Sequence, residues 1–140
     1  MTGSAPFECV IEGIPISANN DRKAARDWKG RVAEGAARAL DTWRFRIEGE
    51  LSALIVLFHT GPYICDTDNI PKHVLDALKG LTYEDDRIIT QVVARRTQQV
   101  SGLILADPPP LVAAFLGSVP HFVYIRLGEG PDHRWLPPVD

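Results

Sequence analysis

The segment between residues 65 and 89, CDTDNIPKHVLDALKGLTYEDDRII, contains the residues whose types and spacing could support chemistry. Like charges at this density repel one another, and neither helix nor strand formation requires them. A positive partner is therefore expected among these side chains. The carboxylates are Asp66, Asp68, Asp76, Glu84, Asp85 and Asp86, and the lysines among them are Lys72 and Lys79.

Oxygen-ligand metal chemistry fits this arrangement. Asp66 and Asp68 stand two positions apart on a loop, and the pair Asp85 and Asp86 belongs to a second loop. Hard cations such as Mg²⁺ take one or two carboxylates and complete their shell with water and substrate phosphate oxygens, and Mn²⁺ would substitute. Lys72, about one helical turn further on, would place a positive charge near a scissile phosphate.

Other chemistries are excluded by spacing. An EF-hand loop begins with D-x-D, but it needs Gly at its sixth position and Glu at its twelfth, where this chain has Pro71 and Ala77. The chain has no Gly-x4-Gly-Lys run and no nucleophile elbow. Cys9 and Cys65 form neither a CxxC nor a Cys/His metal spacing.

Structural interpretations of the same residues stay open. Asp68 could be only a helix N-cap, and Lys72 with Asp76 could be an ordinary exposed pair one helical turn apart. Asp85 is either a second metal ligand or a turn residue. For Asp76 we expect a structural role, with an outer-shell role as the alternative. Capping explains neither Asp66 nor Asp86, so we favour metal binding for these carboxylates.

Charge is segregated along the chain, although the net charge is only −3. Between Arg22 and Arg46 there are eight basic residues and three acidic ones, a net charge of +5. Such a bias on one helix favours contact with phosphates over a role in solubility alone. The residues expected to contact phosphates are Arg22, Lys23, Arg26 and Lys29.

A strand–helix pattern positions these residues. Residues 7–15, 50–60, 87–97 and 121–127 read as strands, and the nearly all-apolar 50–60 is expected to lie centrally in the sheet. Residues 21–40 have apolar positions at helical spacing, and a second helix is predicted to begin near Asp68. Its apolar face would carry Ile70, Val74, Ala77, Leu78 and Leu81, which leaves Asp68, Lys72, Asp76 and Lys79 together on the opposite face.

These elements predict an α+β fold, with a mixed sheet of about four strands packed with two main helices. A length of 140 residues is expected to form one domain. Residues 101–120 hold many Pro and Gly and are interpreted as an irregular insert with a short helix near 111–116, and residues 128–140 as a loose C-terminal tail. The longest apolar run, 53–58, is too short to cross a bilayer, and the start of the chain resembles no signal peptide, so a cytoplasmic protein is expected.

The order DTDNIPKHVLDALKG followed by YEDDRII resembles the RusA family of Holliday junction resolvases. The upstream IPISANN, ahead of a basic helix, is similar to the N-terminal region of that family, so the likeness covers about residues 7–97. The 101–120 insert has no counterpart in it. The matching residues are Asp66, Asp68, Asn69, Lys72, Asp76, Ala77, Leu78, Asp85 and Asp86.

This resemblance implies a function and an assembly. Asp66, Asp68 and Asp86 would bind the catalytic metal, Lys72 would be the catalytic lysine, and Asn69 a supporting polar group. The family forms homodimers that nick two opposed strands of a four-way DNA junction in the presence of Mg²⁺. Two alternatives stay open: a DNA-binding relative that keeps the fold without catalysis, and a metal-dependent phosphoesterase with another substrate.

Overall fold

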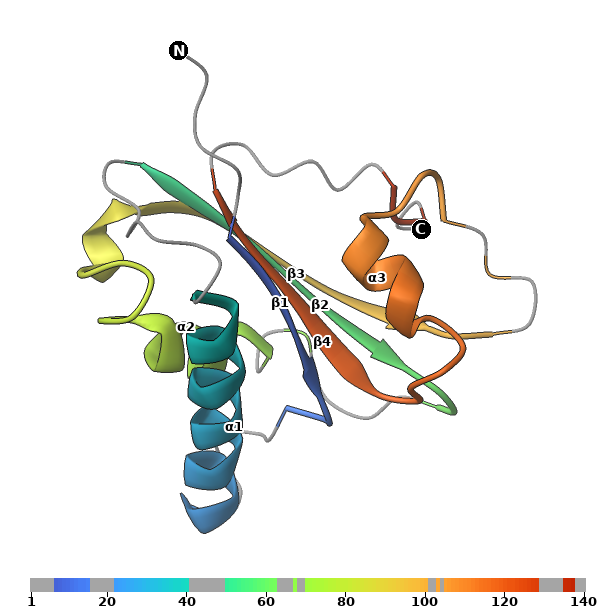
Figure 1. The fold of residues 1–140 in the computed structure, drawn as a ribbon, viewed down its shortest axis with the longest axis horizontal. Helices are drawn as coiled ribbons and strands as arrows, with labels where there is room; N and C mark the ends of the chain where they lie inside the picture. Colours follow the sequence, from blue (N-terminus) through green and yellow to red (C-terminus); the bar gives the residue numbers. More distant parts are fainter. Residues whose placement is uncertain are drawn as a thin grey trace.

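The computed structural model describes residues 7–15, 22–40, 50–62, 67, 70–100, 103, 105–128 and 135–137, except for the side chain of Asp86. The four strands form one mixed sheet, which confirms the predicted α+β class (Figure 1). None of the helices in these ranges is long and apolar enough to span a membrane. In chain order the elements are β1 (Phe7–Glu12), α1 (Arg22–Leu40), β2 (Leu51–His59), α2 (Ile70–Leu78), the 3-10 turn η2 (Asp86–Ile88), β3 (Ile89–Gln98), α3 (Pro110–Phe115) and β4 (Phe122–Gly128).

The strand order is β1-β4-β2-β3, so β1 and β3 form the two edges of the sheet. β2 and β3 are parallel, with Leu51 beside Ile89 at one end and His59 beside Gln98 at the other. β4 is antiparallel to both β1 and β2. The connection from β2 to β3 is a crossover through α2, as parallel neighbours require.

All nine residues of β2 are buried, because helices or other side chains cover both faces of this interior strand. Alternate residues point to opposite faces, so Ala53, Ile55 and Leu57 belong to one core cluster and Leu54, Val56 and Phe58 to the other. The expectation that the apolar run at 50–60 lies centrally is confirmed.

On the first face of the sheet lie α1 and α2 (Figure 1). α1 buries Trp28, Val32 and Ala36, which stand four residues apart on one side of the helix. α2 buries Ile70, Val74 and Leu78 by the same spacing. Helix α2 ends at Leu78, earlier than its apolar pattern predicts, but Leu81 in the following turn still packs against this core.

The second face is covered by α3 and by residues near the C-terminus (Figure 1). Trp135 is only 6% exposed and stacks at 6.3 Å from Phe58, with an edge contact at 5.8 Å to Tyr124. The interpretation of 128–140 as a loose tail is therefore wrong for residues 135–137. Within the 101–120 insert, the predicted short helix is confirmed as α3, with Pro110 in its first turn.

Candidate functional site

The acidic motif begins in the connection between β2 and α2. β2 ends at His59, and the structure describes the chain to residue 62, then Thr67 alone, and again from Ile70. Asp66, Asp68 and Asn69, three of the predicted site residues, therefore lie outside the described residues. Thr67, between the two aspartates in sequence, is exposed and lines a pocket beside residues 94–98 of β3.

Lys72 and Asp76 lie on the solvent-facing side of α2, as the helical spacing predicts. Both side chains are exposed, and the apolar side of the same helix faces the core. Among the described side chains, the Lys72 ammonium has no ion-pair partner, and it forms no bridge with Asp76. The Lys72 side chain is therefore exposed at the start of α2.

The second acidic loop forms the turn before β3. The backbone N–H and the Nε of Arg87 donate to the two Asp85 carboxylate oxygens at 3.0 and 2.9 Å. These hydrogen bonds, first from the backbone and then from the side chain of Arg87, hold the pKa of Asp85 below its usual range. The carboxylate of Asp85 is thus committed to the turn, which favours the structural interpretation of this residue.

Asp86 opens the turn η2, directly before β3. Its backbone lies near the end of the sheet where Leu51 pairs with Ile89, whereas Thr67 lines a pocket with residues of the second half of β3. The Asp86 side chain is outside the described part of the structure. The convergence of Asp66, Asp68 and Asp86 on one metal therefore stays a prediction.

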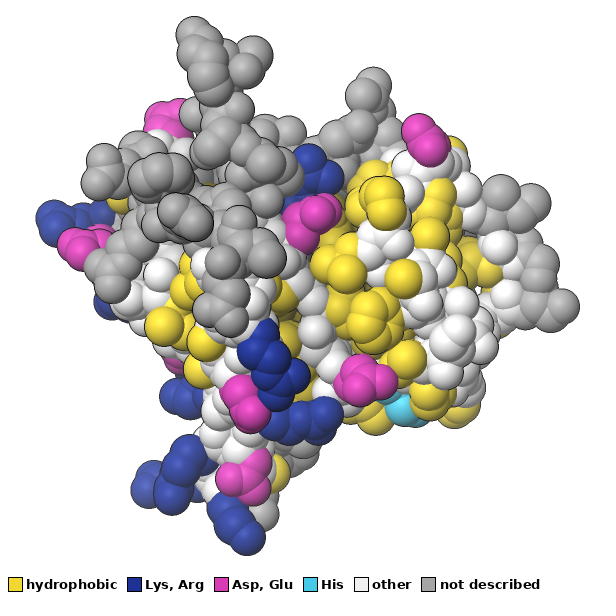
Figure 2. Space-filling view, in the orientation of Figure 1, with side chains coloured by type: hydrophobic (Ala, Val, Ile, Leu, Met, Phe, Trp, Pro, Cys, Tyr) yellow, Lys and Arg dark blue, Asp and Glu magenta, His cyan; other side chains and the backbone are white. Residues whose placement is uncertain are grey.

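The basic surface predicted on the first helix lies on α1. Figure 2 shows Lys and Arg side chains gathered along this helix. Arg22, Lys23 and Arg26 are exposed, and Lys29 is half-buried. Other cations of α1 serve the fold: Arg31 donates to the Glu12 carbonyl, and Arg38 pairs with Glu34 at 2.8 Å.

The basic helix and the helix that carries Lys72 lie next to each other. His73, only 8% exposed, has a pKa below its usual range, chiefly because of burial and next because of the positive charge of Lys29. The Lys29 ammonium is therefore close enough to the start of α2 to lower the pKa of His73. Helices α1 and α2 pack against each other, so the cationic surface of α1 lies on the helix next to the one that carries Lys72.

The sequence did not identify the polar residues of β3 as candidates for a functional site. Arg95, Arg96, Thr97 and Gln98 line the pocket that also includes Thr67. The signal in the sequence is a pair of adjacent arginines near the end of a strand, which places one cation on each face. Two adjacent arginines do not indicate a binding groove unless it is known that their strand lies at the edge of the sheet.

A magnesium ion would need oxygen ligands from the acidic loops. In the described ranges, no three His, Cys, Asp or Glu side chains lie close enough to hold a metal. The candidate ligands Asp66, Asp68 and Asp86 all have side chains outside those ranges. The donors are carboxylates, the ligand type that suits Mg²⁺ and Mn²⁺.

The sequence profile of the family described as Endodeoxyribonuclease RusA matches residues 17–104. The matched region runs from the segment before α1 through β3, and it includes both acidic loops and α2. No match is found among curated proteins. Because the profile covers more than half of the 140 residues, the family is established by sequence, and it is the same family that the acidic motif resembles. The chain belongs to the RusA family of endodeoxyribonucleases.

Proposed function

We propose that this chain is a Mg²⁺-dependent, structure-selective endonuclease that resolves four-way DNA junctions by paired phosphodiester hydrolysis. The observation that carries the proposal is the family match over residues 17–104, which contains the complete acidic motif. The exposed position of Lys72 at the start of α2 supports it.

In this proposal Asp66, Asp68 and Asp86 hold the metal, with Mn²⁺ as a substitute. When bound, the metal would supply a water of lowered pKa and offset negative charge on the phosphate. Asn69 would support the loop by hydrogen bonding. Asp76, exposed on α2 one turn after Lys72, would act in the outer shell of the site or only on the helix surface.

Lys72 would stabilise the additional negative charge that develops on the phosphate during hydrolysis. Its ammonium is a point charge on a flexible stem, so it can follow a phosphate oxygen as the bond geometry changes. The neighbouring cations of α1 would hold the flanking DNA by contacts to backbone phosphates, which carry no sequence information. Arg22, Lys23, Arg26 and Lys29 fill this role.

We further propose that residues 1–140 form one nuclease domain and that two copies assemble as a two-fold dimer. A four-way junction presents two equivalent scissile phosphates, and an isologous pair supplies two equivalent sites. Hydrophobic side chains gather on the surface over α3 (Figure 2). Ala113 and Ala114 are exposed there beside the half-buried Phe115, so this surface is a candidate for the dimer contact.

Nicking of a synthetic four-way junction tests the proposal. The intact protein should nick opposed strands with Mg²⁺ and should not nick them with EDTA. Asp68→Asn keeps the size and the capping ability of the side chain but removes one negative charge, so nicking should fall on the order of a hundredfold. Junction binding should survive this change. Unchanged nicking by Asp68→Asn would exclude the metal site, and binding without any nicking by the intact protein would favour the non-catalytic alternative.

A further inference from the structure

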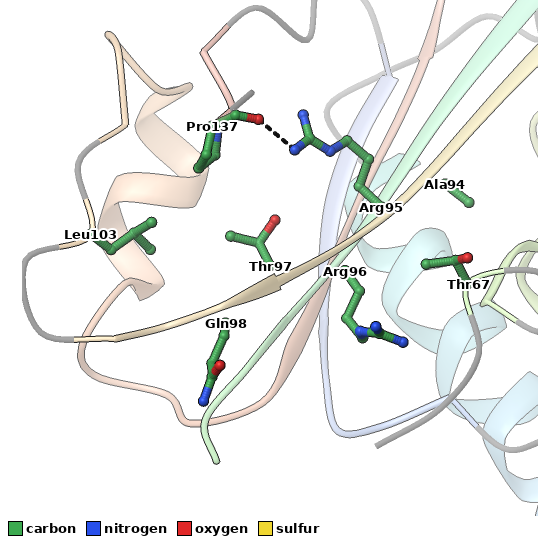
Figure 3. Close-up of a pocket in the computed structure, with 8 residues that line it drawn as sticks. All are labelled: Thr67, Ala94, Arg95, Arg96, Thr97, Gln98, Leu103 and Pro137. Carbon is green, nitrogen blue, oxygen red and sulfur yellow. Dashed lines mark hydrogen bonds between the residues drawn. The ribbon is translucent and has the colours of Figure 1, made fainter. Parts of the chain in front are cut away.

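The free edge of β3 carries a groove whose arginines lie outside the acidic motif. β3 pairs with β2 on one side, and no other strand of the described structure pairs with its opposite side. The groove has a volume of about 460 Å³. It is lined by Thr67, Ala94, Arg95, Arg96, Thr97, Gln98, Leu103 and Pro137 (Figure 3).

We infer that this β3-edge groove binds the sugar-phosphate backbone of substrate DNA, with Arg95 and Thr97 as phosphate ligands. The inference rests on the proposed nuclease function, because it adds a binding surface next to that site. Among the lining residues that the structure describes, two are arginines and none is acidic, although the chain as a whole has a net charge of −3. This local charge is complementary to DNA phosphates.

Arg95 is held in place before any ligand arrives. Its Nη2 donates to the Pro137 carbonyl at 2.5 Å, and Pro137 follows the buried Trp135 and Leu136. Partial burial lowers the pKa of Arg95 from its ordinary value, but a guanidinium is basic enough to stay charged at neutral pH despite this shift. The bond to Pro137 uses one of five donors, so the same group can also donate to a phosphate oxygen.

Thr97 supplies a second donor on the same side of the strand. Thr97 is only 6% exposed, and its hydroxyl has no hydrogen-bond partner among the described residues. A buried hydroxyl without a partner is unfavourable, because it has lost its hydrogen bonds to water. Figure 3 shows Thr97 and Arg95 projecting from the side of β3 that faces Pro137. An acceptor oxygen in the groove would satisfy both groups.

The groove includes Thr67, which belongs to the connection that carries two of the proposed metal ligands. Thr67 stands between Asp66 and Asp68 in sequence and lines the groove from the side where Arg96 projects (Figure 3). Residues 94–98 span about 13 Å along the strand at the usual rise per residue. Because one strand of a DNA duplex has a phosphate every 3.4 Å or so along the axis, a backbone that crosses the edge of β3 can contact more than one side chain of this groove.

A second protein strand is the other occupant that an open sheet edge would admit. Charged side chains on an edge strand oppose such pairing, and here two adjacent arginines flank the groove. The charge of the described arginines and the presence of Thr67, which stands between two proposed metal ligands in sequence, both favour DNA. If this edge instead contacted a second copy of the chain, substitutions in the groove would change the oligomeric state of the protein.

Junction affinity measured over a salt series, without metal, tests the inference. Arg95→Gln should make the slope of log affinity against log salt less negative by about 0.9, the value for one phosphate that is no longer neutralised. Thr97→Val keeps the shape but removes the hydroxyl, so it should weaken junction binding while thermal stability stays equal or rises. The matched control is Arg38→Gln, since Arg38 is an exposed arginine of α1 that pairs with Glu34 away from the groove.

In nicking assays, Arg95→Gln should raise KM more than it lowers kcat, because the change affects binding rather than the reacting atoms. An unchanged salt slope in Arg95→Gln and unchanged affinity in Thr97→Val, in folded proteins, would overturn the inference. A shift of the sedimentation coefficient in the variants, with DNA affinity unaltered, would also overturn it and assign the edge to protein contact. Loss of nicking in Asp68→Asn with no effect of Arg95→Gln would leave the nuclease proposal intact and remove only the groove.

Discussion

The Asp85 carboxylate is engaged by Arg87 through both of its oxygens. The backbone N–H of Arg87 donates to Oδ1 at 3.0 Å, and the guanidinium contacts Oδ2 through Nε at 2.9 Å and Nη2 at 2.8 Å. These contacts lie in the turn that leads into β3, which favours a structural role for Asp85. The adjacent Asp86 is the carboxylate that we propose for the metal.

Substitution of the two aspartates should separate these roles. Asp86→Asn removes a proposed metal ligand, so junction nicking should fall on the order of a hundredfold. Asp85→Asn retains a side chain that can accept from the Arg87 N–H, and nicking should decrease far less. Single-turnover nicking at saturating Mg²⁺ measures both effects. Equal losses in the two variants would show that Asp85 also contributes to the metal site.

His73 should make stability dependent on pH. Burial and the charge of Lys29 lower its folded-state pKa below the unfolded value near 6.5. The unfolded chain therefore binds a proton on His73 more readily than the folded chain does. As a result, the free energy of unfolding does not depend on His73 titration above about pH 6.5, and it decreases as the pH falls from there toward the folded-state pKa. Both ring nitrogens are buried without a hydrogen-bond partner among the described residues.

The substitution His73→Leu should therefore stabilise the protein, by about 1 kcal/mol or more at pH 7.5 because two unsatisfied polar atoms are removed. The gain should be larger at pH 5.5, where the unfolded wild-type chain gains a proton. Thermal unfolding at the two pH values measures both quantities. The pKa of His59 is also lowered by burial, so part of the pH dependence should remain in the variant. An equal gain at both pH values would contradict the assignment to His73.

Trp135 should be required for stability. Its ring packs on Phe58 and Tyr124 in the core on the second face of the sheet, so Trp135→Ala should lower the free energy of unfolding by about 3–5 kcal/mol. Val100→Ala is the control, because Val100 is 50% exposed and its truncation should change stability by about 0.5 kcal/mol or less. Urea denaturation measures both variants. A change of less than about 1 kcal/mol for Trp135→Ala would show that this packing contributes little.

The sheet and the two main helices could be predicted because their signals are local. The apolar run of β2 and the four-residue spacing of Trp28, Val32 and Ala36 each report burial within one element. The packing of Trp135 could not be predicted in this way. Its partner Phe58 in β2 is far away in the sequence, and its partner Tyr124 in β4 is separated from it by a segment that contains Gly and Pro. Burial of that kind depends on how elements meet in space.

The candidate site also has a part that could be predicted from the sequence and a part that could not. The acidic motif and the exposed face of α2 follow from spacing within the chain, and the structure confirms that Lys72 and Asp76 are exposed. The groove beside Arg95 could not be predicted, because it exists only when β3 is the edge strand and Pro137 returns to its side. Long-range register and side-chain partners determine such features.

The cationic surface of α1 should contribute affinity for DNA but no chemistry. Changing Arg22, Arg26 and Lys29 together to Ala removes three cations, of which the first two are exposed and the third lies near the start of α2. Junction binding should weaken, and the salt dependence should flatten by about 0.9 for each phosphate that the variant no longer neutralises. The rate of nicking at saturating DNA should change much less than the affinity, since the proposed metal ligands and Lys72 are retained.

The matched control for this variant is Glu34→Ala combined with Arg38→Ala, which removes an ion pair of the same helix without changing its net charge. Exposed pairs of this kind contribute roughly 0–1 kcal/mol to stability, so the control should fold normally and bind with the salt dependence of the intact protein. Affinity measured at several salt concentrations, together with single-turnover nicking, separates the possibilities. If the triple variant and the control bind alike, the positive charge of α1 serves solubility, and the DNA contacts must come from other parts of the protein, with the β3-edge groove as the first candidate.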